Sequence, residues 1–168
     1  GAGAVVIEAG DTEGILAHRM HADGSFGVET LSCDARIEGN AVHGTGFIRM
    51  NGRQVFKLAV ESLSNSFVEV CSMAGMTPED VDVWVPHQAN IRIIEAVAKR
   101  LELPMEQVMV NIEHFGNTSA ATIPLAIWEN EHLLKKGDNL IMTAFGAGFV
   151  HGASYYKWAY DGSDFVGK

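Results

Sequence analysis

Two polar residues, His87 and Asn117, stand at points of the sequence where chemistry can be done. His87 follows the strand-like run 81–85 and precedes a helical pattern, and Asn117 follows a second apolar run in the same way. The carboxyl ends of parallel strands meet at one edge of an α/β sheet, so we expect the two side chains to converge there. An imidazole and an amide can both donate hydrogen bonds to one oxygen, which would stabilise an enolate or an oxyanion.

Both residues also have ordinary structural explanations. A single histidine at a strand end is commonly a satisfied hydrogen-bonding group, and an asparagine before Thr118 and Ser119 can simply mark the entry to a helix. The spacing by itself therefore leaves two alternatives open, a catalytic pair or two structural residues.

The elements that would position the pair alternate between strands and helices. Apolar residues at steps of three and four predict helices over 53–74 and 91–101, and Thr118 or Ser119 can cap another. Strands are predicted over 4–9, 14–20, 81–85, 108–112, 139–144 and 149–158, whereas 22–50 has little periodicity. This alternation predicts an α/β protein with parallel strand pairing and helices on both faces of the sheet.

Composition excludes several classes of protein. The 168 residues carry 12 Lys+Arg against 21 Asp+Glu, a net charge of −9, which argues against nucleic-acid binding because phosphate contacts need a basic surface. No apolar run approaches the ~20 residues of a membrane helix, and the opening GAGAVVIEAG lacks the charged start of a signal peptide. We expect a soluble, cytoplasmic protein without nucleic-acid or membrane partners. The abrupt start also predicts that further sequence precedes Gly1.

The cysteines and the paired histidines do not indicate a metal centre. Cys33 and Cys71 form neither a disulfide framework nor a Cys-x-x-Cys pair, and Cys71 lies on the apolar side of the long helix. His18 and His21 are three residues apart in a predicted strand, so they face opposite sides and make a poor metal pair. We predict no metal and no resident cofactor.

Three motifs, in order and at matching spacing, resemble the β-ketoacyl-acyl carrier protein synthase III family. They are PHQAN at 86–90 followed by Arg92, HFGNTSA at 114–120, and FGAGF at 145–149. The resemblance extends to GAGA at the start, HADG at 21–24 and VFKLAV at 55–60, and it covers nearly everything except the tail.

The resemblance implies the C-terminal half of a duplicated, thiolase-like fold. This half would have a mixed, mostly parallel five-stranded sheet with helices on both faces. Residues 1–50 would be closing strands and a loop of the N-terminal half, 51–160 the C-terminal half, and 161–168 a tail. The family's nucleophilic cysteine lies in the preceding half, and neither Cys33 nor Cys71 matches it.

The resemblance also implies an activity, the decarboxylative condensation of an acyl-CoA primer with malonyl-acyl carrier protein. His87 and Asn117 would bind the malonyl thioester carbonyl, and the Gly146 region would supply a backbone N–H to an oxyanion hole. Related elongating synthases carry a histidine where Asn117 stands, which favours the initiating type, in fatty acid or polyketide synthesis. Ala147 replaces a glycine that is frequent in the family.

Basic residues form two groups within this acidic chain. Arg49, Arg53 and Lys57 recur every four residues and would form a ridge if the long helix began before Arg49. The second group lies on the helix after His87 and consists of Arg92, Lys99 and Arg100. Solubility is the ordinary role of such residues, but they could also hold a phosphopantetheine phosphate, a coenzyme A nucleotide or an acidic carrier protein.

The resemblance favours the second interpretation. It places Lys57 and Arg92 near the pantetheine tunnel and the carrier surface, and Phe56 and Asn90 beside the pantetheine arm. Expected partners are acyl carrier protein, acyl-CoA, the cysteine-bearing half and a second copy in a homodimer. Two alternatives stay open: a noncatalytic binding or assembly half-module, and a synthase-III-like enzyme that transfers acyl groups to oxygen or nitrogen.

Overall fold

A mixed four-stranded sheet forms the centre of the computed structural model, which describes residues 1–7, 9–11 and 14–165. The strand order is β1-β8-β7-β6, with β1 Ile15–Ala22, β6 Val83–Pro86, β7 Asn139–Gly146 and β8 Val150–Lys157. The β6–β7 pair is parallel, and the β7–β8 and β1–β8 pairs are antiparallel. The β7–β8 hairpin and the parallel β6 together bring the ends of β6 and β7 to one edge of the sheet.

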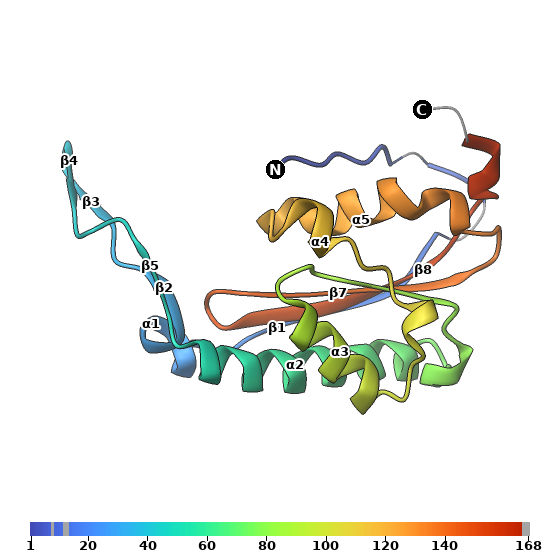
Figure 1. Ribbon diagram of the computed structural model, residues 1–168, viewed down its shortest axis with the longest axis horizontal. Coiled ribbons are helices and arrows are strands. Elements are labelled where there is room, and N and C mark those ends of the chain that lie inside the picture. The colour runs from blue at the N-terminus through green and yellow to red at the C-terminus, as the bar shows by residue number, and fades with distance from the viewer. Residues whose placement is uncertain (8, 12–13, 166–168) are drawn as a thin grey trace.

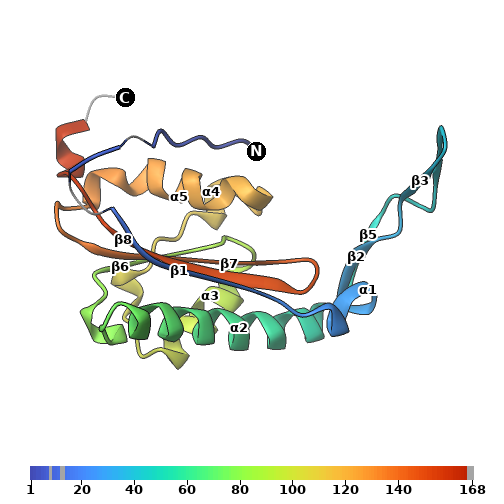
Figure 2. The same ribbon diagram turned by 180° about the vertical axis from the view of Figure 1, so that it is seen from behind.

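Helices cover both faces of this sheet (Figures 1 and 2). On one face lie α2 (Gly52–Met73) and α3 (Ile91–Arg100), and on the other lie α4 (Ile112–Phe115) and α5 (Thr122–Asn130). A one-turn helix, α1 (Gly27–Thr30), directly precedes residues 31–50. Short 3₁₀ turns lie at 24–26, 78–80, 105–107, 119–121, 131–133 and 162–165. The predicted α/β class with a mixed sheet and helices on both faces is confirmed.

The strand content differs from the prediction of five mostly parallel strands. Among the described residues the sheet has four strands and one parallel pair. The strand predicted over 108–112 is reduced to a single parallel bridge between Val108 and Trp84, with Met109 N–H donating to the Trp84 carbonyl at 2.9 Å. The reason is local: a 3₁₀ turn ends at Gln107 and α4 begins at Ile112, so few residues remain for a strand.

The first predicted strand, over 4–9, is also absent from its described residues, which have no regular structure. Residues 1–7 instead lie along α5 (Figures 1 and 2). A Cβ atom on Gly3 would lie 2.6 Å from the Pro124 Cβ, so only glycine permits this close approach. A strand needs a neighbour to complete its hydrogen bonds, and the described residues provide none here.

The long helix α2 follows its predicted pattern and begins at a specific cap. The Asn51 side chain accepts a hydrogen bond from the Gln54 backbone N–H at 3.2 Å, which satisfies one of the free donors of the first turn. Arg49 therefore lies outside the helix, in β5, and pairs with Asp34 at 3.0 Å. The predicted ridge from Arg49 to Lys57 is wrong at Arg49, because the helix begins only after the Asn51 cap.

Two apolar cores lie on opposite faces of the sheet because residues alternate along β6 and β7. Trp84 and Ile141 pack in the core under α2 and α3, whereas Val85 and Leu140 pack in the core under α5. On α2 the buried residues recur at helical spacing and include Ala59, Leu63, Phe67, Val70 and Cys71. These cores hold the ends of β6 and β7 in a fixed position.

A buried hydrogen bond between the side chains of Trp84 and Thr143 yields a test of the core. The indole N–H of Trp84 donates to Thr143 Oγ1 at 2.9 Å, and both residues are almost fully buried. Thr143→Val keeps the shape but leaves the indole without an acceptor, so we expect the free energy of unfolding to fall by about 1–3 kcal/mol. Urea denaturation would measure this loss. Thr143→Ser keeps the hydroxyl and should preserve more stability than valine, and equal stability of the two variants would contradict the interpretation.

Residues 31–50 form two small antiparallel ribbons that project from one end of the molecule (Figures 1 and 2). One pairs β2 (Leu31–Cys33) with β5 (Ile48–Met50), and the other pairs β3 (Arg36–Glu38) with β4 (Ala41–His43). The prediction of an irregular stretch therefore missed short strands. Large apolar side chains are exposed on these ribbons, namely Ile37, Val42, Phe47, Ile48 and Met50. Surface of this kind is typical of a contact with another protein segment.

Within the described residues, none of the helices combines the length and the apolar character that crossing a bilayer requires.

Candidate active site

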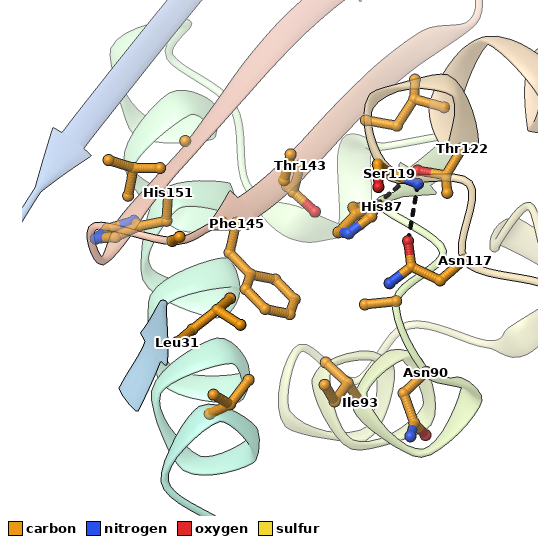
Figure 3. Close-up of a pocket in the computed structure, with 18 of the residues that line it drawn as sticks. Leu31, His87, Asn90, Ile93, Asn117, Ser119, Thr122, Thr143, Phe145 and His151 are labelled. Atoms are coloured by element: carbon orange, nitrogen blue, oxygen red, sulfur yellow. Dashed lines mark hydrogen bonds between the residues drawn. The ribbon is translucent and has the colours of Figure 1, made fainter. Parts of the chain in front are cut away.

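An open cleft of about 1180 Å³ lies at the sheet edge where β6 and β7 end. Seven of the ten residues predicted for the site line it: Arg53, Phe56, His87, Asn90, Arg92, Asn117 and Gly146. The other three, Lys57, Lys99 and Arg100, are exposed and lie outside its lining. The expected convergence of His87 and Asn117 at one edge of the sheet is therefore observed, and Figure 3 shows both at the cleft.

His87 is held at both its backbone and its ring. Its backbone N–H donates to the Thr143 carbonyl at 2.7 Å, which extends the β6–β7 pairing by one residue. Ring atom Nδ1 lies 2.6 Å from the hydroxyl Oγ1 of Thr122, at the start of α5. Burial lowers the pKa of His87, which favours the neutral ring. A neutral ring that accepts the threonine proton at Nδ1 carries its own proton on Nε2 and can donate it to a ligand.

Asn117 is held so that its amide nitrogen is available. The side-chain oxygen accepts the Ser119 backbone N–H at 2.9 Å, as Figure 3 shows, and this leaves the NH₂ group to donate. The preceding Gly116 has φ of +65° and ψ of −163°, a conformation that favours glycine. The loop between α4 and α5 is thus shaped by Gly116 and by the Ser119 contact, and it delivers a hydrogen-bond donor that is independent of pH.

Phe145 forms an apolar wall beside His87. Its ring meets the His87 ring edge to face, with centroids 5.6 Å apart, and stacks on the Phe149 ring at the same distance. Other apolar residues line the cleft from β1 and the ribbons, namely Met20, Leu31, Ile48 and Met50. The cleft therefore combines two hydrogen-bond donors with a mainly apolar surround, which strengthens hydrogen bonds to a developing negative charge.

The basic residues divide between the cleft and the far end of α3. Arg53 and Arg92 lie in the first turns of α2 and α3 and reach the cleft. Asn90 caps α3, because its side chain accepts the Arg92 backbone N–H at 2.9 Å. Lys99 and Arg100 occupy the last turn of α3, where positive charge also stabilises the negative end of the helix dipole. Gly146 is the last residue of β7 and lies opposite Val150 at the cleft.

Neither cysteine adds a reactive group to this site. Burial raises the pKa of the Cys71 thiol to about 11, so it stays protonated and unreactive, and Cys33 is exposed on β2 outside the cleft lining. In the part of the chain that the structure describes, no group of three or more His, Cys, Asp or Glu side chains could hold a metal ion.

Thr122 and the apolar wall were missed by the sequence reasoning. Thr122 is 35 residues from His87, and no local pattern marks it, because the contact depends on how α5 packs over the end of β6. The apolar residues that line the cleft from the ribbons, Leu31, Ile48 and Met50, come from a segment whose short strands leave no periodic signal.

Known proteins resemble this chain throughout its length. A sequence model of a protein family, described as 3-oxoacyl-[acyl-carrier-protein (ACP)] synthase III C terminal, matches residues 71–158. A relative from Porphyromonas gingivalis, named beta-ketoacyl-[acyl-carrier-protein] synthase III, is 49% identical over 173 residues, covering 97% of this chain and 50% of the relative. A relative of the same name from Aquifex aeolicus is 47% identical over 161 residues, covering 94% and 49%. The chain thus spans about half the length of these relatives.

Solved structures agree with the sequence relatives. The crystal structure of 3-oxoacyl-[acyl-carrier-protein] synthase III from Aquifex aeolicus matches with a TM-score of 0.81 and 44% identity, covering 90% of this chain and 46% of that one. The priming beta-ketosynthase from the R1128 polyketide biosynthetic pathway matches with a TM-score of 0.80 and 30% identity, covering 90% and 47%. These likenesses confirm the thiolase-like fold.

Proposed function

The chain belongs to the family of C-terminal domains of 3-oxoacyl-[acyl-carrier-protein] synthase III, and we therefore propose that it supplies the malonyl-activating part of a condensing enzyme. The observation that carries this proposal is that His87 and Asn117 both line the cleft, with His87 Nδ1 in contact with Thr122 and the Asn117 oxygen engaged by the Ser119 N–H. The enzyme would start fatty acid or polyketide chains, and one similar structure is named a priming beta-ketosynthase of a polyketide biosynthetic pathway.

In the proposed reaction both donors bind the thioester carbonyl oxygen of a malonyl group. The bond between the carboxylate carbon and the central carbon breaks, carbon dioxide leaves, and the electron pair moves onto the carbonyl oxygen as an enolate. His87 and Asn117 stabilise that negative charge, which develops only in the transition state and the intermediate.

The enolate carbon then attacks an acyl thioester held on the cysteine of the other half of the enzyme. A new carbon–carbon bond forms, and the cysteine leaves as a thiolate. We propose that the backbone N–H near Gly146, at the end of β7, stabilises the oxyanion of this step. Neither Cys33 nor Cys71 lines the cleft, so we propose that condensation requires the cysteine-bearing half.

We further propose that the basic residues around the cleft bind the substrate carrier. Arg53 and Arg92 line the cleft and Lys57 lies one turn along α2 from Arg53, so they are suited to a pantetheine phosphate or an acidic carrier protein. Phe56 and Asn90 would lie beside the pantetheine arm, and Lys99 and Arg100 would extend the carrier surface along α3.

Exposed apolar surface supports the further proposal that a cysteine-bearing half and a second copy cover this chain. The outer side of α5 and the turn after it expose Trp128 and Leu133 at 57% and 61%, and residues 1–7 lie along α5 without a strand neighbour. The ribbons expose a further apolar face.

We also propose that residues 1–50 belong to the N-terminal half, that residues 51–160 form the C-terminal half and that residues 161–168 are a tail. Strand β1 of the first part pairs with strand β8 of the second. The proposed location is the cytoplasm.

The experiment that tests this function separates it from its two alternatives. The complete enzyme, with this chain and the cysteine-bearing half, is incubated with acyl-CoA and malonyl-acyl carrier protein, and intact mass, carbon dioxide release and product are measured. We expect an acylated cysteine and a 3-oxoacyl product. No acylation and no carbon dioxide release would favour a noncatalytic module. Transfer to an alcohol or amine acceptor without decarboxylation would favour the other alternative.

Thr122 provides a separate prediction about the orientation of the catalytic ring. Thr122→Val removes the hydroxyl that contacts His87 Nδ1, so the ring loses the partner that keeps its proton on Nε2. We expect kcat for malonyl decarboxylation to fall roughly tenfold with little change in KM. Thr122→Ser keeps the hydroxyl and should retain most of the activity. An equal loss in both variants would contradict the role of the hydroxyl.

A further inference from the structure

A cluster of ionisable side chains lies where β1, β8 and α2 meet, outside the groups used in the reaction. His151 on β8 and His21 on β1 are directly paired across the two strands, and their rings stack with centroids 5.0 Å apart. His151 Nδ1 lies 2.8 Å from the Ser66 hydroxyl on α2. His21 Nε2 lies 2.6 Å from Glu69, which also pairs with Arg19 at 3.2 Å. His151 thus contacts both α2, through Ser66, and β1, through His21.

A continuous row of rings connects this cluster with the catalytic histidine. The His151 ring centroid is 6.4 Å from that of Phe149, which is almost fully buried. Phe149 stacks on Phe145 at 5.6 Å, and Phe145 meets His87 at 5.6 Å. Figure 3 shows Phe145 between His151 and His87 at the cleft. A movement of His151 would therefore be passed to the wall of the site through two packed rings.

We propose that His151 is a positioning residue, which in its neutral form holds Phe149 and Phe145 against His87 and loosens that wall when it becomes protonated. The proposal deepens the proposed function by adding pH control to the same site, and its activity readout rests on that function. It requires no covalent step and no further ligand.

The charges around His151 explain why protonation would disturb it. Arg19 and His21 face it from β1, and Glu69 from α2, whereas Ala144, Phe145 and Gly146 on β7 carry no ionisable group. When both histidines are charged, two positive rings face each other at 5.0 Å, and the single carboxylate is already shared with Arg19. Burial and His21 lower the pKa of His151, and Glu69 opposes them only in part, so the neutral ring is favoured near neutral pH.

The test compares pH profiles of kcat for malonyl decarboxylation by the complete enzyme. His151→Phe keeps an aromatic ring against Phe149 but cannot be protonated, and His132→Phe changes an exposed histidine outside the cluster. Between about pH 7.5 and about pH 5.5 we expect the rate to fall several-fold more in the wild type and in His132→Phe than in His151→Phe. His87 is present in all three proteins, so its own titration contributes to every profile. Superimposable profiles would overturn the proposal.

A second measurement stands apart from activity. Ring proton signals of His87 in nuclear magnetic resonance spectra should respond to two titrations in the wild type and to one in His151→Phe, while thermal melting shows that the variant is folded. If the wild type releases no carbon dioxide at any pH, the proposed function fails, but this titration still decides the inference. A single His87 titration in the wild type would then refute it.

Discussion

Replacing His87 with alanine in the complete enzyme should lower kcat for malonyl decarboxylation by about 10²–10³-fold, the usual cost of losing one preorganised donor to an oxyanion. The expectation follows from the geometry of the ring. Burial lowers its pKa and Thr122 contacts Nδ1, so in the proposed reaction Nε2 donates to the carbonyl oxygen of the malonyl thioester. Because that oxygen gains its charge only as carbon dioxide leaves, kcat should fall much more than KM rises.

His132→Ala is the matched control for this variant, since it removes an exposed histidine from a turn after α5. It should leave the decarboxylation rate unchanged. Acylation of the cysteine by acyl-CoA should also continue in His87→Ala, because that step does not need the malonyl site. Near wild-type turnover in His87→Ala would remove His87 from the reaction.

Asn117→Asp should have an effect of similar size, about 10²–10³-fold on the same rate, although the side chain keeps its shape. The carboxylate can still accept the Ser119 backbone N–H at 2.9 Å, so the loop has no reason to move. What changes is the atom that faces the substrate, because an NH₂ donor becomes an oxygen with negative charge. The variant would repel the enolate that the wild type stabilises, and raising the pH would not restore activity.

The control for this charge change is Asn65→Asp, at an exposed position on α2. Both variants alter net charge equally, so a general electrostatic effect would appear in both. We expect the rate of Asn65→Asp to match the wild type. Comparable losses in the two variants would show that charge, and not the donor at Asn117, determines the rate.

Much of the fold was predictable because local patterns and packing agree. The apolar spacing of α2 and α3 identified both helices, and their amide caps at Asn51 and Asn90 determine where they begin. The ridge prediction failed at Arg49 because the four-residue spacing of basic residues extends beyond the start of α2. That start is set by the Asn51 cap, which only the side-chain geometry reveals. The segment 108–112 has strand-like residues, but the 3₁₀ turn that ends at Gln107 and the helix that begins at Ile112 leave it a single bridge to Trp84.

For the site, the sequence identified the two donors and missed the groups supplied by packing. His87 could be found because it follows β6 at the edge of an α/β sheet. Asn117 follows the short helix α4 and not a strand, so its position depended on the HFGNTSA motif. Thr122 reaches His87 only through the docking of α5, and Phe149 reaches Phe145 across the turn from β7 to β8. His151 carried no interpretable signal, because its partners Ser66 and His21 come from segments far away in sequence.

The central claim is that His87 and Asn117 act on the same oxygen of a malonyl thioester, and a double-mutant cycle tests it most directly. Carbon dioxide release is measured for the wild type, His87→Ala, Asn117→Ala and the double variant of the complete enzyme. If both donors bind one oxygen, the double variant should be much less impaired than the product of the two single losses, because they act as a unit. Losses that multiply independently, or single variants that turn over like the wild type, would contradict the account.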